Sequence, residues 1–185
     1  MQNINNVKPQ KLDQFVFPND ITEGHVRNLV RAGSTDPILL HGPYGTGKTT
    51  LARLLPVALT PEVLYEADVL ERNASKDTGI EGMRKLAANC KLIPLGPQRY
   101  VILDECDGLS PEAQKSLKGL LDELSATTTF IFCTNDVHNV NEGIRSRCYK
   151  IALGPPDPSR WAGRACEIMR DHGYEVQKEV MAQGL

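Results

Sequence analysis

The amino-acid sequence predicts an α/β fold of three layers, in which helices cover both faces of a central five-stranded parallel sheet. Short apolar runs alternate along the chain with segments whose apolar residues recur at helical spacing. Each short run is apolar almost throughout, which is typical of strands buried on both faces. Strands separated by helices need crossover connections, and these connections make the strands parallel.

The first half of the chain contains two expected helices and two expected strands. A helix over 21–33 ends at a glycine, and an apolar strand over 37–42 follows it. Residues 48–59 have helical periodicity, with a proline near the end of the segment. Residues 62–68 are the second strand candidate.

The second half continues the alternation. A helix is expected over 78–93, where apolar or small residues line one face. A second helix is expected over 111–124, because Ser110 can cap its start and Pro111 suits its first position. The remaining strands are expected over 99–105, 127–136 and 148–153.

The composition changes after the last expected strand. Residues 154–158 read GPPDP, a stiff and turn-prone joint, and residues 159–173 have the pattern of a further helix. We therefore expect a domain boundary near Gly154, with the main domain over 1–153. Residues 154–185 number only about thirty, too few for an independent core.

Size and charge exclude several classes of protein. The chain has 185 residues, of which 41% are hydrophobic and 24% charged, as in ordinary soluble globular domains. Its net charge of −2 means that any binding to nucleic acid needs a local basic patch. No apolar run approaches the roughly 18 residues of a membrane span, and the N-terminus lacks the apolar stretch of a secretory signal. We expect a cytoplasmic protein with no membrane partner.

The cysteines and histidines show no spacing typical of disulfides or metal ligands. The five cysteines are widely separated and include no C-x-x-C pair, so we expect most of them to be small residues of the core. They are Cys90, Cys106, Cys133, Cys148 and Cys166. The four histidines likewise predict no metal site.

Residues 42–49, GPYGTGKT, fit the phosphate-binding pattern G-x-x-x-x-G-K-[ST] and lie between an expected strand and an expected helix. Glycines let the backbone N–H groups face a phosphate, and the helix N-terminus favours negative charge. Lys48 is expected to reach the β- and γ-phosphates, and Thr49 to ligate Mg²⁺. The expected nucleotide-binding residues are Gly42, Pro43, Tyr44, Gly45, Thr46, Gly47, Lys48, Thr49 and Thr50.

Two adjacent acids, Asp104 and Glu105, end the expected strand over 99–105. Carboxylates at the end of a buried strand are costly unless a cation or a reaction uses them. The carboxyl ends of strands are also the edge at which open α/β sheets bind ligands. We expect Asp104 to hold Mg²⁺ through water and Glu105 to act as the general base.

These motifs resemble those of the AAA+ ATPases, and three further segments resemble the clamp-loader subunits among them, of the replication factor C and bacterial gamma/tau type. Residues 73–85 look like the clamp-loader segment that joins the second strand to its helix. Asn135, after the strand over 127–136, resembles the sensor 1 residue. Ser146-Arg147-Cys148 is similar to the SRC motif of the family. Tyr44 and Cys106 depart from the usual proline and alanine, and neither departure removes a catalytic group.

The resemblance implies a function in DNA replication. Residues 1–153 would form an AAA+ P-loop ATPase domain, and residues 154–185 part of a helical lid. The implied cofactors are ATP and Mg²⁺, and the implied partners are other AAA+ clamp-loader subunits, a sliding clamp and primer–template DNA. Asn135 would orient the attacking water, and Arg147 would act as an arginine finger in the site of a neighbouring subunit, which makes both candidate catalytic residues beside Lys48, Asp104 and Glu105.

Two other functions stay open on the same residues. The chain could belong to another AAA+ machine that remodels DNA junctions or protein complexes. It could also be a nucleotide-binding assembly subunit that donates Arg147 and hydrolyses little itself, although the intact Lys48, Thr49, Asp104 and Glu105 argue against this.

Basic residues on two expected helices are the candidates for DNA contact, and Gln114 matches a family glutamine that couples such contact to the acidic pair. Contacts of this kind would hold phosphates without reading sequence. The alternative is an ordinary solvated face. The candidates are Lys76, Arg84, Lys85, Lys91, Lys115 and Lys118.

Overall fold

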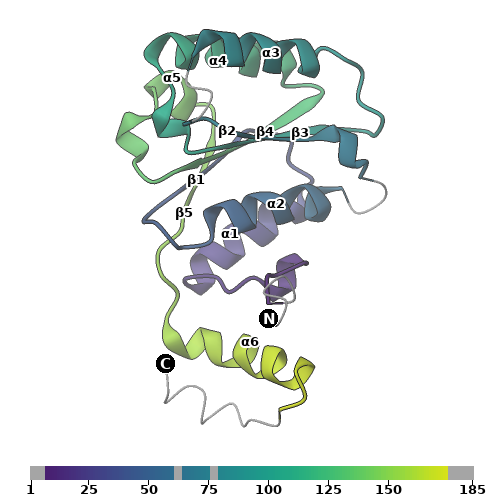
Figure 1. Cartoon of the computed structure of the whole chain (residues 1–185), viewed down its shortest axis with the longest axis vertical. Helices are drawn as coiled ribbons and strands as arrows, with labels where there is room; N and C mark the ends of the chain where they lie inside the picture. Colours follow the sequence, from purple (N-terminus) through teal and green to yellow (C-terminus); the bar gives the residue numbers. More distant parts are fainter. Residues whose placement is uncertain (1–6, 61–63, 76–78, 175–185) are drawn as a thin grey trace.

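The computed structural model describes residues 7–60, 64–75 and 79–174, and it contains a five-stranded parallel sheet between two layers of helices (Figure 1). The strand order is β2-β3-β4-β1-β5, and every neighbouring pair is parallel. This confirms the predicted fold class. The strands are β1 (Ile38–His41), β2 (Val69–Asn73), β3 (Arg99–Asp104), β4 (Thr128–Thr134) and β5 (Tyr149–Ala152).

Helices cover both faces of the sheet, as Figure 1 shows. One face packs on α1 (Asp20–Arg31) and α2 (Lys48–Leu59), and the other on α3 (Ile80–Cys90), α4 (Pro111–Leu124) and α5 (Glu142–Arg145). The last described helix, α6 (Pro158–Asp171), lies beyond α1 and α2, away from the sheet.

Each face of the sheet has its own apolar core, because successive side chains of a strand point to opposite faces. On β4, Phe130 and Phe132 belong to the core under α3 and α4. Ile131 and Cys133 belong to the core under α1 and α2. All four side chains are fully buried, which explains why the strand is apolar without alternation.

Local signals predicted several element boundaries well. The bounds of α2 and α4 agree with the expected segments, and Ser110 caps α4 by accepting a hydrogen bond from the backbone N–H of Ala113. Gly33 follows α1 with φ of +58°, a backbone conformation that favours glycine. All five cysteines are buried and carry free thiols, as predicted for residues of the core.

The predicted strand over 62–68 is wrong. Leu64 and Tyr65 form no strand, Glu66–Asp68 form one turn of 3₁₀ helix, and β2 begins only at Val69. Residues 61–63 lie outside the described part of the chain. A hydrogen bond from the Asp68 N–H to the Tyr65 carbonyl, at 2.9 Å, closes this turn, and the Asp68 carboxylate is buried, where it needs partners.

Asp68 and Arg99 form a buried ion pair, at 3.6 Å, beneath the connection between α3 and β3. The Asp68 carboxylate accepts hydrogen bonds from the backbone N–H groups of Leu95 and Gly96. Arg99 donates to three backbone carbonyls, those of Asn89, Cys90 and Leu92. Buried charges of opposite sign therefore fix the backbone of this connection.

The same connection exposes three large apolar side chains. Leu92, Ile93 and Leu95 are 66%, 90% and 68% exposed, and we call these three residues the apolar loop. Asp68 and Arg99 bind the backbone of the apolar loop at Leu95 and Leu92, while the side chains of the loop face solvent.

Within the described ranges, no helix combines the length and the apolar character needed to cross a membrane. The same ranges contain no group of three or more His, Cys, Asp or Glu side chains arranged as a metal site.

Candidate active site

The phosphate-binding loop connects β1 to α2 at the carboxyl edge of the sheet. Gly42, Gly45 and Gly47 all have positive φ, of 144°, 77° and 86°. A Cβ on Gly42 would lie 2.0 Å from the carbonyl oxygen of Leu153, so the close approach of this backbone also requires glycine. The loop therefore has the curled backbone that the sequence pattern predicts.

Lys48 occupies the first position of α2 with its side chain buried. Its Nζ donates to the backbone carbonyls of Gly42 at 2.9 Å and Pro43 at 2.6 Å. Burial lowers the pKa of Lys48 below its usual value, and the nearby Asp104 carboxylate opposes this effect. The carbonyl contacts hold the Lys48 ammonium inside the loop, where it can reach a bound phosphate.

Thr49 and Asp104, the two residues expected to hold Mg²⁺, contact each other directly. The Thr49 Oγ1 donates to the Asp104 Oδ2 at 2.8 Å, although the two residues are 55 positions apart. A hydroxyl and a carboxylate are hard oxygen ligands of the kind that Mg²⁺ prefers. The pair therefore fits a magnesium ion.

Glu105 has a left-handed backbone, with φ of 54° and ψ of 42°. Among the described residues it is the only one other than glycine with positive φ. Such a conformation costs on the order of 1–3 kcal/mol and tends to occur at functional sites. The turn directs the chain away from the strand immediately after Asp104, whose Oδ1 accepts from the Glu105 N–H at 3.0 Å.

One open pocket of about 320 Å³ brings together most of the predicted nucleotide and catalytic residues. Glu105 and Asn135 face it from the ends of β3 and β4. Gly42 and Pro43 take part through the carbonyls that hold Lys48. The lining residues are Tyr44, Gly45, Gly47, Lys48, Thr49, Thr50, Asp104, Glu105 and Asn135.

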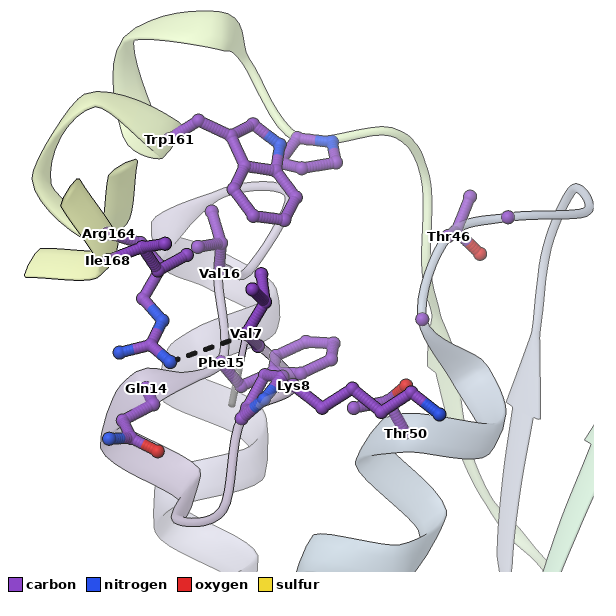
Figure 2. Close-up of a pocket in the computed structure, with 14 residues that line it drawn as sticks. Val7, Lys8, Gln14, Phe15, Val16, Thr46, Thr50, Trp161, Arg164 and Ile168 are labelled. Atoms are coloured by element: carbon purple, nitrogen blue, oxygen red, sulfur yellow. Dashed lines mark hydrogen bonds between the residues drawn. The ribbon is translucent and has the colours of Figure 1, made fainter. Parts of the chain in front are cut away.

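A second cavity, of about 300 Å³, adjoins this pocket and shares Gly45, Gly47 and Thr50 with it. Figure 2 shows that side chains of the N-terminal segment and of α6 enclose it. Its mostly apolar lining fits the base of a nucleotide whose phosphates lie in the loop. Sequence reasoning missed the N-terminal residues here, because that segment reads as a polar arm. The apolar contributors are Val7, Phe15, Val16, Trp161 and Ile168.

Two arginines connect α6 to earlier segments of the chain beside this cavity. Arg164 is buried and donates to the carbonyl oxygen of Val7 at 3.5 Å (Figure 2). Arg160 forms ion pairs with Asp20 and Glu23 of α1. The segment predicted as the start of a lid therefore contacts both the N-terminal segment and α1.

Arg147 lines neither cavity. Its guanidinium makes a two-pronged contact with Asp122 of α4, at 2.7 and 3.1 Å, and donates to the Gly143 carbonyl at 2.8 Å. Hydrogen bonding to Arg147 lowers the pKa of the Asp122 carboxyl below its usual value. The side chain is one-third exposed, so Asp122 orients a guanidinium that still reaches solvent.

The candidate DNA residues divide into paired and unpaired groups on the adjacent helices α3 and α4. Arg84 pairs with Glu81 at 3.5 Å, and Lys91 with Glu123 at 3.1 Å. Within the described part of the chain, no ion pair is found for three other candidates, the exposed lysines Lys85, Lys115 and Lys118. Lys76 lies outside the described residues.

Gln114 is buried near the start of α4 and joins this helix to the segment after β4. Its amide nitrogen donates to the carbonyls of Leu109 and Asn139. Its amide oxygen accepts from the Asn141 N–H at 2.6 Å. The side chain is thus wholly engaged in bonds between the turn after β3 and the segment after β4.

Comparisons with known proteins identify relatives that match most of this chain. The chain is 32% identical over 177 residues to replication factor C small subunit 1 of Pyrobaculum arsenaticum, covering 94% of this chain and 53% of that protein. It is 31% identical over 155 residues to replication factor C subunit 2 of Oryza sativa subsp. japonica, covering 78% and 46%. The chain therefore spans about half the length of these relatives.

Solved structures show the same fold. The RuvB Holliday junction branch migration motor of Thermotoga maritima is 17% identical, with a TM-score of 0.74 over 95% of this chain and 58% of that one. A DNA polymerase III gamma subunit-related protein of Thermotoga maritima is 18% identical, with a TM-score of 0.61 over 86% and 57%. The family described as "ATPase family associated with various cellular activities (AAA)" matches residues 38–155. This range includes the phosphate-binding loop and the acidic end of β3, and the chain belongs to the AAA family of ATPases.

Proposed function

We propose that this chain is an ATP-hydrolysing subunit of a DNA sliding-clamp loader. The convergence of Lys48, Thr49, Asp104 and Glu105 on one pocket carries the hydrolytic part of the proposal. The names of the replication factor C relatives and the Ser146-Arg147-Cys148 motif support the clamp-loader part. Those names also favour it over another AAA+ machine that remodels DNA junctions, since the likeness to RuvB rests on fold alone.

Each residue of the pocket has a role in this proposal. When bound, ATP would supply the phosphoryl group, and Mg²⁺ would neutralise part of the negative charge of the phosphates. Lys48 would hold the β- and γ-phosphates, while Thr49 and Asp104 would hold the ion. Glu105 would accept the proton of the attacking water, and Asn135 would orient that water. Residues 154–185 would contribute part of a lid over the nucleotide.

The Lys48→Ala variant should weaken ATP binding by roughly 10- to 150-fold, because a hydrogen bond to a charged group is worth about 1.5–3 kcal/mol. Isothermal titration of ATP with Mg²⁺ measures the change. The matched control is Lys150→Ala, which removes an exposed lysine of β5 and should leave the affinity unaltered. An undiminished affinity of Lys48→Ala would contradict the assignment of the phosphate site.

Arg147 would act in the site of a neighbouring subunit, because it lines neither cavity of its own chain. We expect ATPase activity per subunit to rise with protein concentration or with added partner subunits. An arginine finger can accelerate hydrolysis by about 10³–10⁵, so Arg147→Ala should abolish the rise while preserving ATP affinity. Arg31→Ala, at an exposed position of α1, is the control. A fast ATPase rate that depends neither on protein concentration nor on the Arg147→Ala substitution would refute an arginine finger that acts between subunits.

The lysines Lys85, Lys115 and Lys118 would hold the phosphates of primer–template DNA. They are better candidates than Arg84 and Lys91, whose charges are already paired on the protein surface. Removing one lysine that binds a phosphate should reduce the slope of log affinity against log salt by about 1. We expect the triple alanine variant to bind several unrelated primed sequences equally weakly. A salt slope equal to that of the wild type would make these lysines an ordinary solvated face.

The apolar loop is the surface that we assign to the sliding clamp. Exposed apolar side chains gathered on one segment indicate a protein contact. Because Asp68 and Arg99 already fix the backbone of the loop, docking would order little further chain. This surface is separate from both cavities.

Ile93→Asp should weaken binding of the sliding clamp from the same organism roughly 30-fold, the effect of removing a hot spot of about 2 kcal/mol. ATP affinity should not change. Val57→Asp provides the control, since Val57 is also an exposed apolar residue but lies on α2. Surface plasmon resonance with immobilised clamp measures the affinity, and equal binding by Ile93→Asp and wild type would exclude the apolar loop.

A further inference from the structure

The left-handed backbone of Glu105 requires contacts that hold it in place. Two of these are local: the Glu105 N–H donates to the Asp104 carboxylate, and the Glu105 carbonyl accepts from the Gly108 N–H at 2.9 Å. Local bonds of this kind shape the turn. They do not set where the turn lies relative to the neighbouring strand.

Cys106 packs in the apolar core beneath the turn, and a contact distant in sequence ties the turn to the end of β4. The Asp107 Oδ1 accepts a hydrogen bond from the Thr134 Oγ1 at 2.9 Å. Thr134 is fully buried at the end of β4, directly before Asn135. In the part of the chain that the structure describes, this is the only side chain to side chain hydrogen bond between residues 105–108 and β4.

The Thr134 hydroxyl also organises the backbone that follows β4. Its oxygen accepts from the Asp136 N–H at 3.1 Å and lies 2.9 Å from the Asp136 carbonyl oxygen. A hydroxyl has only one proton, and a carboxylate is a stronger acceptor than a carbonyl. The proton therefore goes to Asp107, while the hydroxyl oxygen receives the Asp136 N–H.

We propose that Asp107 and Thr134 are positioning residues for hydrolysis, which together hold Glu105 and Asn135 at their working separation. The inference rests on the proposed function, because it takes Glu105 as the base and Asn135 as the residue that orients water. Neither Asp107 nor Thr134 lines the nucleotide pocket, so both act through their neighbours. Loss of the Thr134 hydroxyl would free the turn that carries Glu105 and the backbone after Asn135 at the same time.

The Thr134→Val variant tests the proposal, since it removes the hydroxyl and preserves the shape of the side chain. A small misplacement of catalytic groups can reduce rates by up to about 100-fold, so we expect kcat to fall between about 10- and 100-fold. The Kd for ATP with Mg²⁺ should stay within about twofold of wild type, because the groups that hold the phosphates and the metal ion are unchanged. Thr134→Ser keeps the hydroxyl and should restore kcat.

Thr129→Val is the matched control. Thr129 is also fully buried on β4 and donates to the Thr35 carbonyl at 3.2 Å, but it lies at the opposite end of the strand. Thr129→Val should therefore keep the wild-type kcat. If Thr129→Val loses as much kcat as Thr134→Val, the effect is general loosening of the sheet and the proposal is overturned.

A double-mutant cycle with Asp107→Ala, which removes the acceptor, separates a direct partnership from two independent effects. Partners in one hydrogen bond should give a double variant no slower than the slower single variant. Multiplied losses, or an unchanged kcat in Thr134→Val, would overturn the proposal. If the wild-type chain with its partner subunits neither binds nor hydrolyses ATP, the proposed function itself is wrong, and titration and turnover of wild type reveal this before any variant is compared.

Discussion

The parallel register of β3, β4 and β1 determines where each candidate catalytic residue lies along the edge of the sheet. His41 pairs with Thr134, and Leu103 pairs with Phe132, so three strands reach the same edge within one or two residues of each other. The next residues along each strand are then the phosphate-binding loop, the acidic pair and Asn135. A slip of one residue would turn every side chain of a strand to the other face, and the two apolar cores prevent it.

Because helices bury both faces of the sheet, most polar side chains of the strands lie at the strand ends. Polar groups that are removed from water need partners, and here they find one another across the edge. Thr49 meets Asp104, Thr134 meets Asp107, and the Lys48 ammonium is held by carbonyls of its own loop. The apolar interior thus concentrates the hydrogen bonds where the nucleotide would bind.

The fold and the core of the site could be predicted because they rest on local patterns. Apolar runs, the Ser110 cap and the glycines of residues 42–49 act on neighbours within a few positions. The predictions that failed concern residues whose partners lie far away in the sequence. The start of β2 depends on a buried Asp68 that binds Leu95, Gly96 and Arg99, about thirty residues later.

Other features had no local signal at all. Nothing around Asp122 or Arg147 indicates that they pair across 25 positions, and nothing in the N-terminal segment indicates that it encloses a cavity. The left-handed backbone of Glu105 is equally hidden, since glutamate has no preference for it. In each case the feature is determined by tertiary packing and not by the local sequence.

The contact between Gly42 and Leu153 affects how this chain can be divided for expression. Leu153 follows β5, and its N–H donates to the His41 carbonyl at 2.7 Å while its own carbonyl packs against Gly42. It is fully buried, although it stands at the start of the proline-rich joint. A recombinant fragment cut at the end of the last strand would therefore remove a wall of the phosphate-binding loop, so Leu153 belongs in any ATPase fragment of this chain.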